Sequence, residues 1–308
     1  MKLIIGPEDI VNKCLKKWGI NMTPLEKQII INSLSGGKTS GYIGMHYKAD
    51  YNLFSLVCID DIKCGHPDNF FMKYANDKLS KYCKDYGEVI GTAEDPIIFQ
   101  TMYELEQLMG QEIIWLRGVS FDKLIDIKKG LPGKAKGTLG RFCTTWLKIA
   151  PAFEFWYKYL APEKIKVNLG FRYDEQERTD TFSTTWDFPV STNNYGCHRN
   201  NWVKGLEWRE GRFPLIEDRI FHKDIIDYWQ DKSIHFAKDS NCQFCIFKKI
   251  QQIKMNSINC PDQINWAESK EEKHTWHKYS IKDAKKYIID PEFNYGTGAG
   301  CTAGECIS

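Results

Sequence analysis

Short apolar runs along the chain alternate with stretches in which apolar residues recur every three to four positions. The runs are typical of buried strands and cover residues 28–34, 53–59, 87–91, 112–117 and 166–171. Helical periodicity covers residues 38–47, 69–83, 144–160 and a segment opened by Asp95-Pro96, an N-cap and first-turn pair. Strands that alternate with helices predict parallel pairing with right-handed crossovers, so we expect an α/β fold on an open, doubly wound, mainly parallel sheet.

The strand signal fades after about residue 215. Helical patterns continue at 223–232, from Pro261 to about Tyr279, and at 281–289, and the chain ends in the glycine-rich segment YGTGAGCTAGECIS. These patterns predict three parts. They are an N-terminal helical extension at 1–25, the main α/β domain at 26–220, and a smaller helical, cysteine-bearing C-terminal region at 221–308 with a flexible tail.

Composition is that of an ordinary globular protein. The 308 residues are 42% hydrophobic and 14% aromatic, and a net charge of +2 does not by itself demand a nucleic-acid partner. No apolar stretch approaches the roughly 20 residues that span a bilayer, and the first residues lack signal-peptide features, so we expect a cytoplasmic chain with no membrane partner. In a reducing compartment, clustered members of the eleven cysteines are better interpreted as metal, cluster or redox groups than as disulfides.

The segment INSLSGGKTSG, residues 31–41, places a small-residue turn between an apolar strand and a helix that begins near Lys38. It is not a Walker loop, because that pattern requires glycine at position 32 and this chain has Asn32. Small residues let successive backbone N–H groups converge on an anion at a helix N-terminus. The sequence therefore predicts a phosphate site at the carboxyl end of the first strand, unless the turn is only structural.

Ser35-Gly36-Gly37-Lys38-Thr39-Ser40 resembles the PP-loop of the ATP pyrophosphatase and phosphoadenosine phosphosulfate (PAPS) reductase superfamily, whose fold is called adenine nucleotide alpha-hydrolase-like. Residues 140–151 are similar to the family's C-x-x-x-[RL]-K-x-x-P segment, and residues 168–178 to its G-x-R-x-D-E-x-x-R motif. Residues 213–229 resemble the P-L-I…D-[IV] segment that follows. Asp60-Asp61 with His66-Pro67 is similar to D-T-G-x-E-x-P but departs from it at Asp61 and Ile62.

The resemblance runs from about residue 29 to residue 250 and implies a set of site residues. It implies nucleotide binding by Ser35, Gly36, Gly37, Lys38, Thr39, Ser40, Asp60, Gly170, Arg172, Asp174, Glu175 and Arg178, and catalytic roles for Lys38, Lys148, Arg172 and Cys306. Arginine can clamp phosphate or sulfate, and acidic groups such as Asp174 or Glu175 can hold Mg²⁺. Alternatively, the charged residues 172–178 form only a solvated salt-bridge network on the surface, and Lys148 is an exposed lysine without a ligand.

Cys242 and Cys245 form a C-x-x-C, which Cys143 precedes. This resembles the iron–sulfur branch of the reductases, in which such cysteines hold a [4Fe–4S] cluster. The branch usually has adjacent cysteines, but Thr144 follows Cys143, so Cys260 is our first choice of fourth ligand and Cys301 or Cys306 the next. Zn²⁺ suits four thiolates equally well, and a redox dithiol is a third interpretation. Gly304-Glu305-Cys306 is similar to the reductases' terminal E-C-G-x-H, although Ile307 and Ser308 depart from it.

The resemblance leaves two chemistries. Because the loop is intact, we expect cleavage of ATP to AMP and pyrophosphate, which would activate an acceptor for sulfur transfer. The first alternative is also an enzyme, a thiol-dependent reductase acting on PAPS or adenylyl sulfate. The second alternative is a non-catalytic adenylate sensor. Expected partners are an adenine nucleotide and a sulfur or electron donor protein. A nucleic-acid acceptor could lie along the basic stretches 123–136 and 202–212, and a homo-oligomer is left open.

Overall fold

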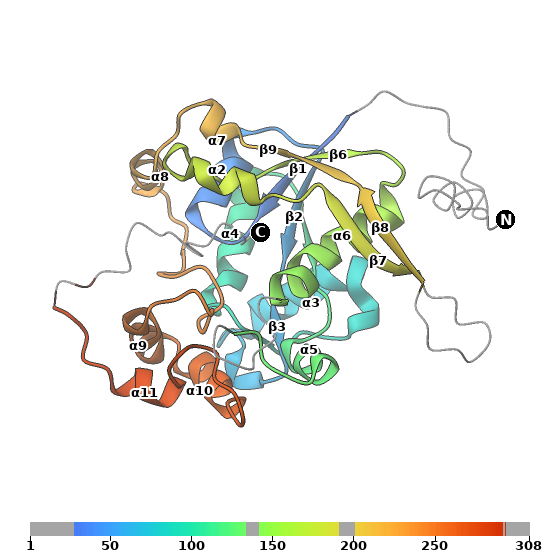
Figure 1. Ribbon diagram of the computed structural model, residues 1–308. Helices are drawn as coiled ribbons and strands as arrows, with labels where there is room; N and C mark the ends of the chain where they lie inside the picture. The colour runs from blue at the N-terminus through green and yellow to red at the C-terminus, as the bar shows by residue number, and fades with distance from the viewer. Residues whose placement is uncertain (1–27, 134–141, 191–200, 292, 294–308) are drawn as a thin grey trace.

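The computed structural model describes residues 28–133, 142–190, 201–291 and 293 (Figure 1). Its centre is a five-stranded sheet in the order β5-β2-β1-β6-β9, and every neighbouring pair is parallel. The strands are β1 (Ile29–Leu34), β2 (Tyr51–Ser55), β5 (Ile113–Leu116), β6 (Ile165–Asn168) and β9 (Arg209–Arg212). The predicted α/β class with a parallel sheet is confirmed, and the arrangement is compatible with a Rossmann-like fold.

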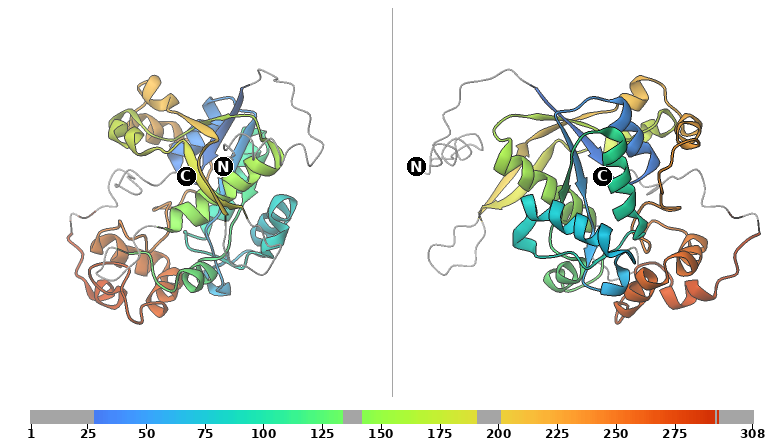
Figure 2. Two further views of the ribbon diagram at one scale, coloured as in Figure 1. Left: turned by 45° about the vertical axis from the view of Figure 1, so that its right-hand side comes forward. Right: turned by 180° about the vertical axis from the view of Figure 1, so that it is seen from behind.

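Helices cover both faces of the sheet (Figures 1 and 2). On one face, α2 (Lys38–His46) and α4 (Ile97–Met109) pack together. The two helices approach closely at Gly44 of α2, where an added Cβ would meet both Met109 and Leu34. The opposite face carries α6 (Ala150–Tyr159), and α3 (Asn69–Cys83) packs along the edge strand β5. The bounds of α3 are those that its apolar periodicity predicts.

A ladder of buried asparagines fixes the register of the three central strands. Asn32 donates to Asn52 on β2 at 2.9 Å, and Asn168 on β6 donates to Asn32 at 2.8 Å. The three residues are aligned partners across β6, β1 and β2. Buried amides need such partners, and a shift of one residue would break both bonds. The asparagine that excludes a Walker loop therefore has a structural role in the sheet.

Two strand predictions are wrong in their bounds. The run at 53–59 divides into β2 and the two-residue β3 (Cys58–Ile59), which pairs antiparallel with β4 (Gly91–Thr92) outside the main sheet. The run at 87–91 is mostly a turn, because Gly87 has a φ of +73° and the backbone of Val89 bonds to the Asn76 side chain. In contrast β9, with the sequence Arg-Glu-Gly-Arg, was not predicted, since a short charged edge strand carries no apolar pattern.

Several helices differ from the pattern. The predicted helix at 144–160 begins at Cys143, contains a π-helical turn at Thr145–Ile149 and continues as α6. The one at 261–279 ends at Ser269, where Glu271 accepts the backbone N–H groups of Trp276 and Ile281. The remaining elements are α5 (Phe121–Lys128), α7 (Pro214–Glu217), α8 (His222–Trp229), α9 (Ile250–Asn259), α10 (Pro261–Ser269), α11 (Ile281–Lys286), the 3₁₀ turns Ile62–Cys64, Lys84–Tyr86 and Tyr173–Thr181, and the hairpin of β7 (Thr185–Val190) with β8 (Asn201–Glu207).

The C-terminal helices α9, α10 and α11 pack on one another and form a second hydrophobic core with β3, α5 and the C-x-x-C segment (Figure 1). Four aromatic rings at its centre, from Phe121, Phe244, Trp266 and Trp276, contact one another. Helix α8 instead packs on α2, and its Trp229 belongs to the core of the sheet. The unit in which α9, α10 and α11 pack together therefore begins after α8 in the chain.

Parts of the predicted organisation fall outside the described residues. These are the N-terminal extension at 1–25 and the glycine-rich tail from residue 294, with Cys301 and Cys306. Among the helices of the described part, none has the length and hydropathy needed to cross a bilayer.

Candidate functional site

The strand order reverses between β1 and β6. From β1 the chain builds β2 and β5 on one side and then returns to add β6 and β9 on the other. In open parallel sheets the crevice at this switch point, outside the carboxyl ends of the strands, is where ligands bind. The segments that leave β1 and β6 here are Ser35–Gly37 and Leu169–Arg172, the two regions in which the sequence predicts phosphate-binding residues.

The turn after β1 is closed by its own side chains. The Ser40 hydroxyl accepts the Ser35 N–H at 3.0 Å and donates to the Gly37 carbonyl at 3.0 Å. Gly36 has a φ of +69°, and a Cβ there would lie 2.6 Å from Cγ1 of Ile98. Only glycine satisfies both the backbone conformation and this close approach. The sequence Ser-Gly-Gly-x-x-Ser therefore follows from the geometry of the turn.

The N-terminus of α2 lacks a side-chain cap. Its N-cap residue is Gly37, and its first turn has no acidic residue. The first N–H groups of a helix have no partner within the helix, and the helix dipole adds positive potential there. An anion at this end would satisfy the N–H groups, with Lys38 in the first helical position beside it.

Arg172 joins the segment after β6 to the loop. It is only 4% exposed, and its Nη1 donates to Thr39 Oγ1 at 3.2 Å. Its guanidinium also contacts Asp174 at 3.3 Å and Glu175 at 3.3 Å. Gly170 lies against the loop as well, because a Cβ on it would be 3.3 Å from Thr39 Cγ2. The two switch-point segments are thus in direct contact.

Glu175 organises the arginines. This buried carboxylate accepts from Arg178 at 2.8 Å as well as from Arg172, and Arg178 stacks on the Phe171 ring at 4.3 Å. Residues 172–178 are therefore a partly buried network at the crevice, in place of the solvated surface network considered from the sequence. Asp60 is held elsewhere: it accepts from the Ser120 hydroxyl at 2.5 Å at the start of α5.

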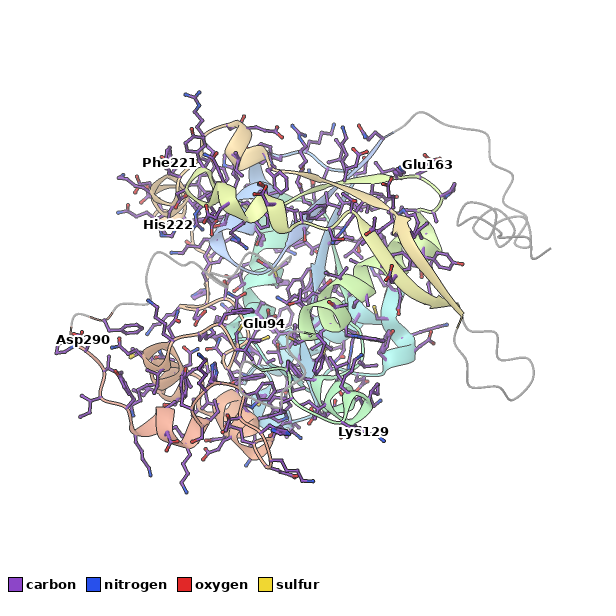
Figure 3. All side chains as sticks on the ribbon, in the orientation of Figure 1. Glu94, Lys129, Glu163, Phe221, His222 and Asp290 are labelled. Atoms are coloured by element: carbon purple, nitrogen blue, oxygen red, sulfur yellow. The ribbon has the colours of Figure 1, made fainter. Side chains whose placement is uncertain are left out.

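His222, which the sequence did not single out, lies beside this network at the start of α8, where Figure 3 labels it. Its Nδ1 is buried and has no hydrogen-bond partner among the described residues. Burial lowers the pKa of His222, and the positive charges of Arg172 and Lys38 lower it further, against the opposing effect of Asp174 and Glu175. The imidazole near Arg172 and Lys38 is therefore mostly neutral at neutral pH. A lone histidine between Phe221 and Lys223 carries no motif that would reveal this from the sequence.

We expect His222 to make the free energy of unfolding depend on pH. Because its pKa in the folded protein is below the ordinary value of 6.5, the unfolded chain binds more protons between these two values. The free energy of unfolding should therefore fall as the pH decreases between about pH 7 and about pH 5. His46, whose pKa burial and Lys232 lower, should contribute with the same sign. Urea unfolding across this range should show a shallower fall in His222→Gln, and identical slopes in the two proteins would contradict the assignment.

Three of the predicted cysteines meet in one cavity. Cys143, Cys242 and Cys245 line an open cavity at the junction of the sheet with the second core. Phe121, Phe244 and Trp276 form much of its wall. Burial is the largest of the effects that raise the pKa of the Cys242 thiol, and Cys143 and Cys245 are near enough to raise it further. The prediction that Cys143 joins the C-x-x-C across nearly a hundred residues agrees with this placement.

Lys148 lines the same cavity and is buried with Glu94. Its Nζ lies 3.1 Å from Glu94 Oε1, and the two side chains are 9% and 1% exposed. Glu94, labelled in Figure 3, follows β4 where the sheet meets the C-terminal helices. Lys148 therefore lines the cavity while it is paired with Glu94. It is buried, so it is not the exposed lysine considered from the sequence, and as an anion ligand it would already have a carboxylate partner.

The fourth predicted ligand, Cys260, is not among the residues that line this cavity. It lies between α9 and α10, where burial, followed by the charge of Asp95 and a hydrogen bond to it, holds the pKa of the thiol far above the ordinary value. Within the described ranges, no three histidine, cysteine, aspartate or glutamate side chains are grouped closely enough to hold a metal ion. A four-thiolate site would need a ligand other than Cys260, and Cys306 lies outside the described residues.

The C-x-x-C segment touches the phosphate loop. A Cβ on Gly37 would lie 3.0 Å from the Ser240 hydroxyl, two residues before Cys242. The indole of Trp229 donates to the Lys38 carbonyl at 2.8 Å. The chain from α8 to Cys242 therefore runs directly over the loop, and a ligand there would lie close to the thiol cavity.

The chain matches no protein-family model, and no curated protein matches it significantly. What the site can do must therefore be judged from its geometry. An uncapped helix N-terminus, a buried arginine and a cavity of three thiols adjoin one another at the switch point of a parallel sheet.

Proposed function

We propose that the chain is a PP-loop enzyme with an adenine nucleotide alpha-hydrolase-like fold, which cleaves ATP to AMP and pyrophosphate and so activates an acceptor for sulfur transfer. One observation carries the proposal. Arg172, buried in the segment after β6, donates to Thr39 in the first turn of α2, so a cationic fork lies beside an uncapped helix N-terminus. This is the combination that binds phosphate groups.

In this reaction an acceptor oxygen attacks the α-phosphorus, the bond from that phosphorus to the bridging oxygen breaks, and pyrophosphate leaves with the bond electrons. The loop N–H groups and Lys38 stabilise the departing pyrophosphate, and Arg172 stabilises the charge that develops around phosphorus. The proton of the acceptor passes to solvent. A sulfur nucleophile from a donor protein then displaces AMP from the adenylated acceptor.

Mg²⁺, when bound, neutralises phosphate charge. Asp174 fits this role, because it is exposed and, among the described residues, contacts Arg172 Nε at 3.3 Å, whereas Glu175 is engaged by two arginines. Mg²⁺ is usually held by one or two carboxylates together with substrate phosphates, so Asp174 would supply one of its ligands.

The thiol cavity supports sulfur chemistry at the same site. Cys143, Cys242 and Cys245 are the candidate ligands for the proposed [4Fe–4S] cluster, with Zn²⁺ as the alternative. They line one cavity, but within the described residues they are not grouped closely enough to hold a metal ion, so we derive no step through the group. The visible absorption spectrum of anaerobically purified protein, with metal analysis, decides between iron–sulfur, zinc and a metal-free trithiol cavity.

The test of the proposed function is product analysis. Anaerobic protein is incubated with labelled ATP or labelled PAPS, with candidate acceptors including tRNA and DNA. AMP with pyrophosphate supports the proposal. Sulfite with 3′-phosphoadenosine would establish the reductase instead, and binding without either product would establish an adenylate sensor.

A double variant tests whether product formation depends on the loop. Ser35→Ala with Lys38→Ala should abolish nucleotide binding and product formation, because it removes a side chain that closes the turn and the nearest ammonium. Lys48→Ala, an exposed lysine just beyond the other end of α2, is the matched control and should leave both unchanged. Undiminished binding by the double variant would exclude the loop as the phosphate site.

A further inference from the structure

Arg209, the first residue of β9, is a buried cation without a carboxylate partner. It is 5% exposed, and its guanidinium carbon lies 4.5 Å from the centre of the Phe182 ring and 4.8 Å from that of Trp208. Its Nε donates to the Ser183 carbonyl at 3.1 Å. Among the described residues, the two terminal Nη groups have no acceptor and no acidic side chain pairs with the guanidinium.

Other buried cations of this chain are compensated. Lys78, Lys148 and Lys248 each form an ion pair with a carboxylate. Arg117, which has no carboxylate partner within the described part of the chain either, donates to two backbone carbonyls. Burial lowers the pKa of Arg209 to about 9, so it is still charged at neutral pH. Aromatic faces and one carbonyl offset only part of the cost of burying a guanidinium with five donors.

Arg209 faces a cavity that has room for a counterion. The cavity lies between the sheet and the start of α6, has about 30 Å³ of space open to water-sized molecules, and Ile31 and Val167 form part of its apolar wall. Arg209 and Lys148 are the charged residues that line it, and among the described residues no acidic side chain does. The rest of the wall is apolar apart from Ser33 and Ser55, so its cationic end favours a small, compact anion over a nucleotide.

The end of the cavity that Arg209 lines is distinct from the phosphate loop, although Ser33 and Ser55 extend the wall toward the carboxyl ends of β1 and β2. Arg209 pairs with Ile165, the first residue of β6, whereas the loop follows the last residue of β1. Because the strands are parallel, Arg209 lies at the amino edge of the sheet and the loop at the carboxyl edge. We propose that this chamber is a second anion site, in which the Nη groups of Arg209 bind an inorganic anion no larger than sulfate.

A bromide soak tests this proposal on the unaltered protein. Crystals of the full chain are soaked in sodium bromide, and anomalous scattering locates the ion. We expect a bromide within hydrogen-bonding distance of Arg209 Nη inside the cavity. Ordered bromide at other places on the protein, with only water or nothing at Arg209, would overturn the proposal.

Thermal unfolding in solution supplies a second readout. Sulfate should stabilise the wild type with a saturable component, as expected for a ligand that binds only the folded state, in addition to the shared gradual effect of a kosmotropic salt. Arg209→Met should lose the saturable component. Arg212→Met, on the same strand but half-exposed and paired with Glu217, should keep it. A saturable component that persists in Arg209→Met would contradict the assignment, and the soak remains decisive if that variant does not fold.

Discussion

A valine at position 36 is expected to abolish nucleotide binding while the sheet remains folded. Gly36 has a φ of +69°, a region that costs about 1–2 kcal/mol for an ordinary residue and more for a β-branched one. The new Cβ would also lie 2.6 Å from Cγ1 of Ile98, which α4 holds in the core. The turn must therefore move, and its N–H groups leave the positions that face the crevice. We expect an affinity loss of about 100-fold or more, equivalent to about 2.8 kcal/mol.

Gly87→Val is the matched control. Gly87 has a φ of +73°, but a Cβ there would meet nothing within 4 Å, and it lies in the turn after α3. This variant also carries the backbone cost of a positive φ but not the clash, so its thermal stability should fall while its affinity for ATP stays at the wild-type value. Calorimetric titration with a non-hydrolysable ATP analogue measures both variants. Wild-type affinity in Gly36→Val would show that the turn does not hold phosphate.

Replacing Lys148 with methionine is expected to destabilise the fold by about 3–5 kcal/mol, the usual cost of removing one partner of a buried ion pair. The substitution deprives Glu94, which is 1% exposed, of the ammonium 3.1 Å away. Urea unfolding measures the loss. The double variant Glu94→Gln with Lys148→Met should recover a large part of it, because a buried neutral amide costs less than a buried carboxylate.

Lys164→Met serves as the comparison for this pair. Lys164 contacts Glu207 at 2.8 Å, but the two side chains are 57% and 61% exposed. Exposed pairs contribute only about 0–1 kcal/mol, so this substitution should have little effect. If Lys148→Met were no more destabilising than Lys164→Met, Lys148 would not be the buried partner described above.

Much of the sheet and the loop could be predicted because local patterns dictate them. Buried parallel strands need continuous apolar runs, and the turn at Gly36 accepts only glycine, so both are visible in the sequence. The position of Arg172 follows from its place just after β6. Its contact with Thr39 depends on the β1–β6 pairing, which the alternation of strands and helices does not specify.

The remaining features depend on contacts between distant segments. Glu94 becomes a partner of Lys148 only through the packing of the β4–α4 connection against the turn before α6. Cys260 has suitable spacing for a metal ligand but is directed to Asp95 by the packing of α9 and α10. The buried charge of Arg209 on a polar edge strand contradicts the usual surface pattern. None of these leaves a periodic signal in one sequence.

The most direct test of the central claim is a crystal structure of the full chain with a non-hydrolysable ATP analogue and Mg²⁺. We predict that the phosphates lie within hydrogen-bonding distance of the N–H groups that follow Ser35 and of the Arg172 guanidinium, with the α-phosphate on the side of the thiol cavity. A nucleotide ordered at another place on the molecule, with the turn empty, would contradict the proposal.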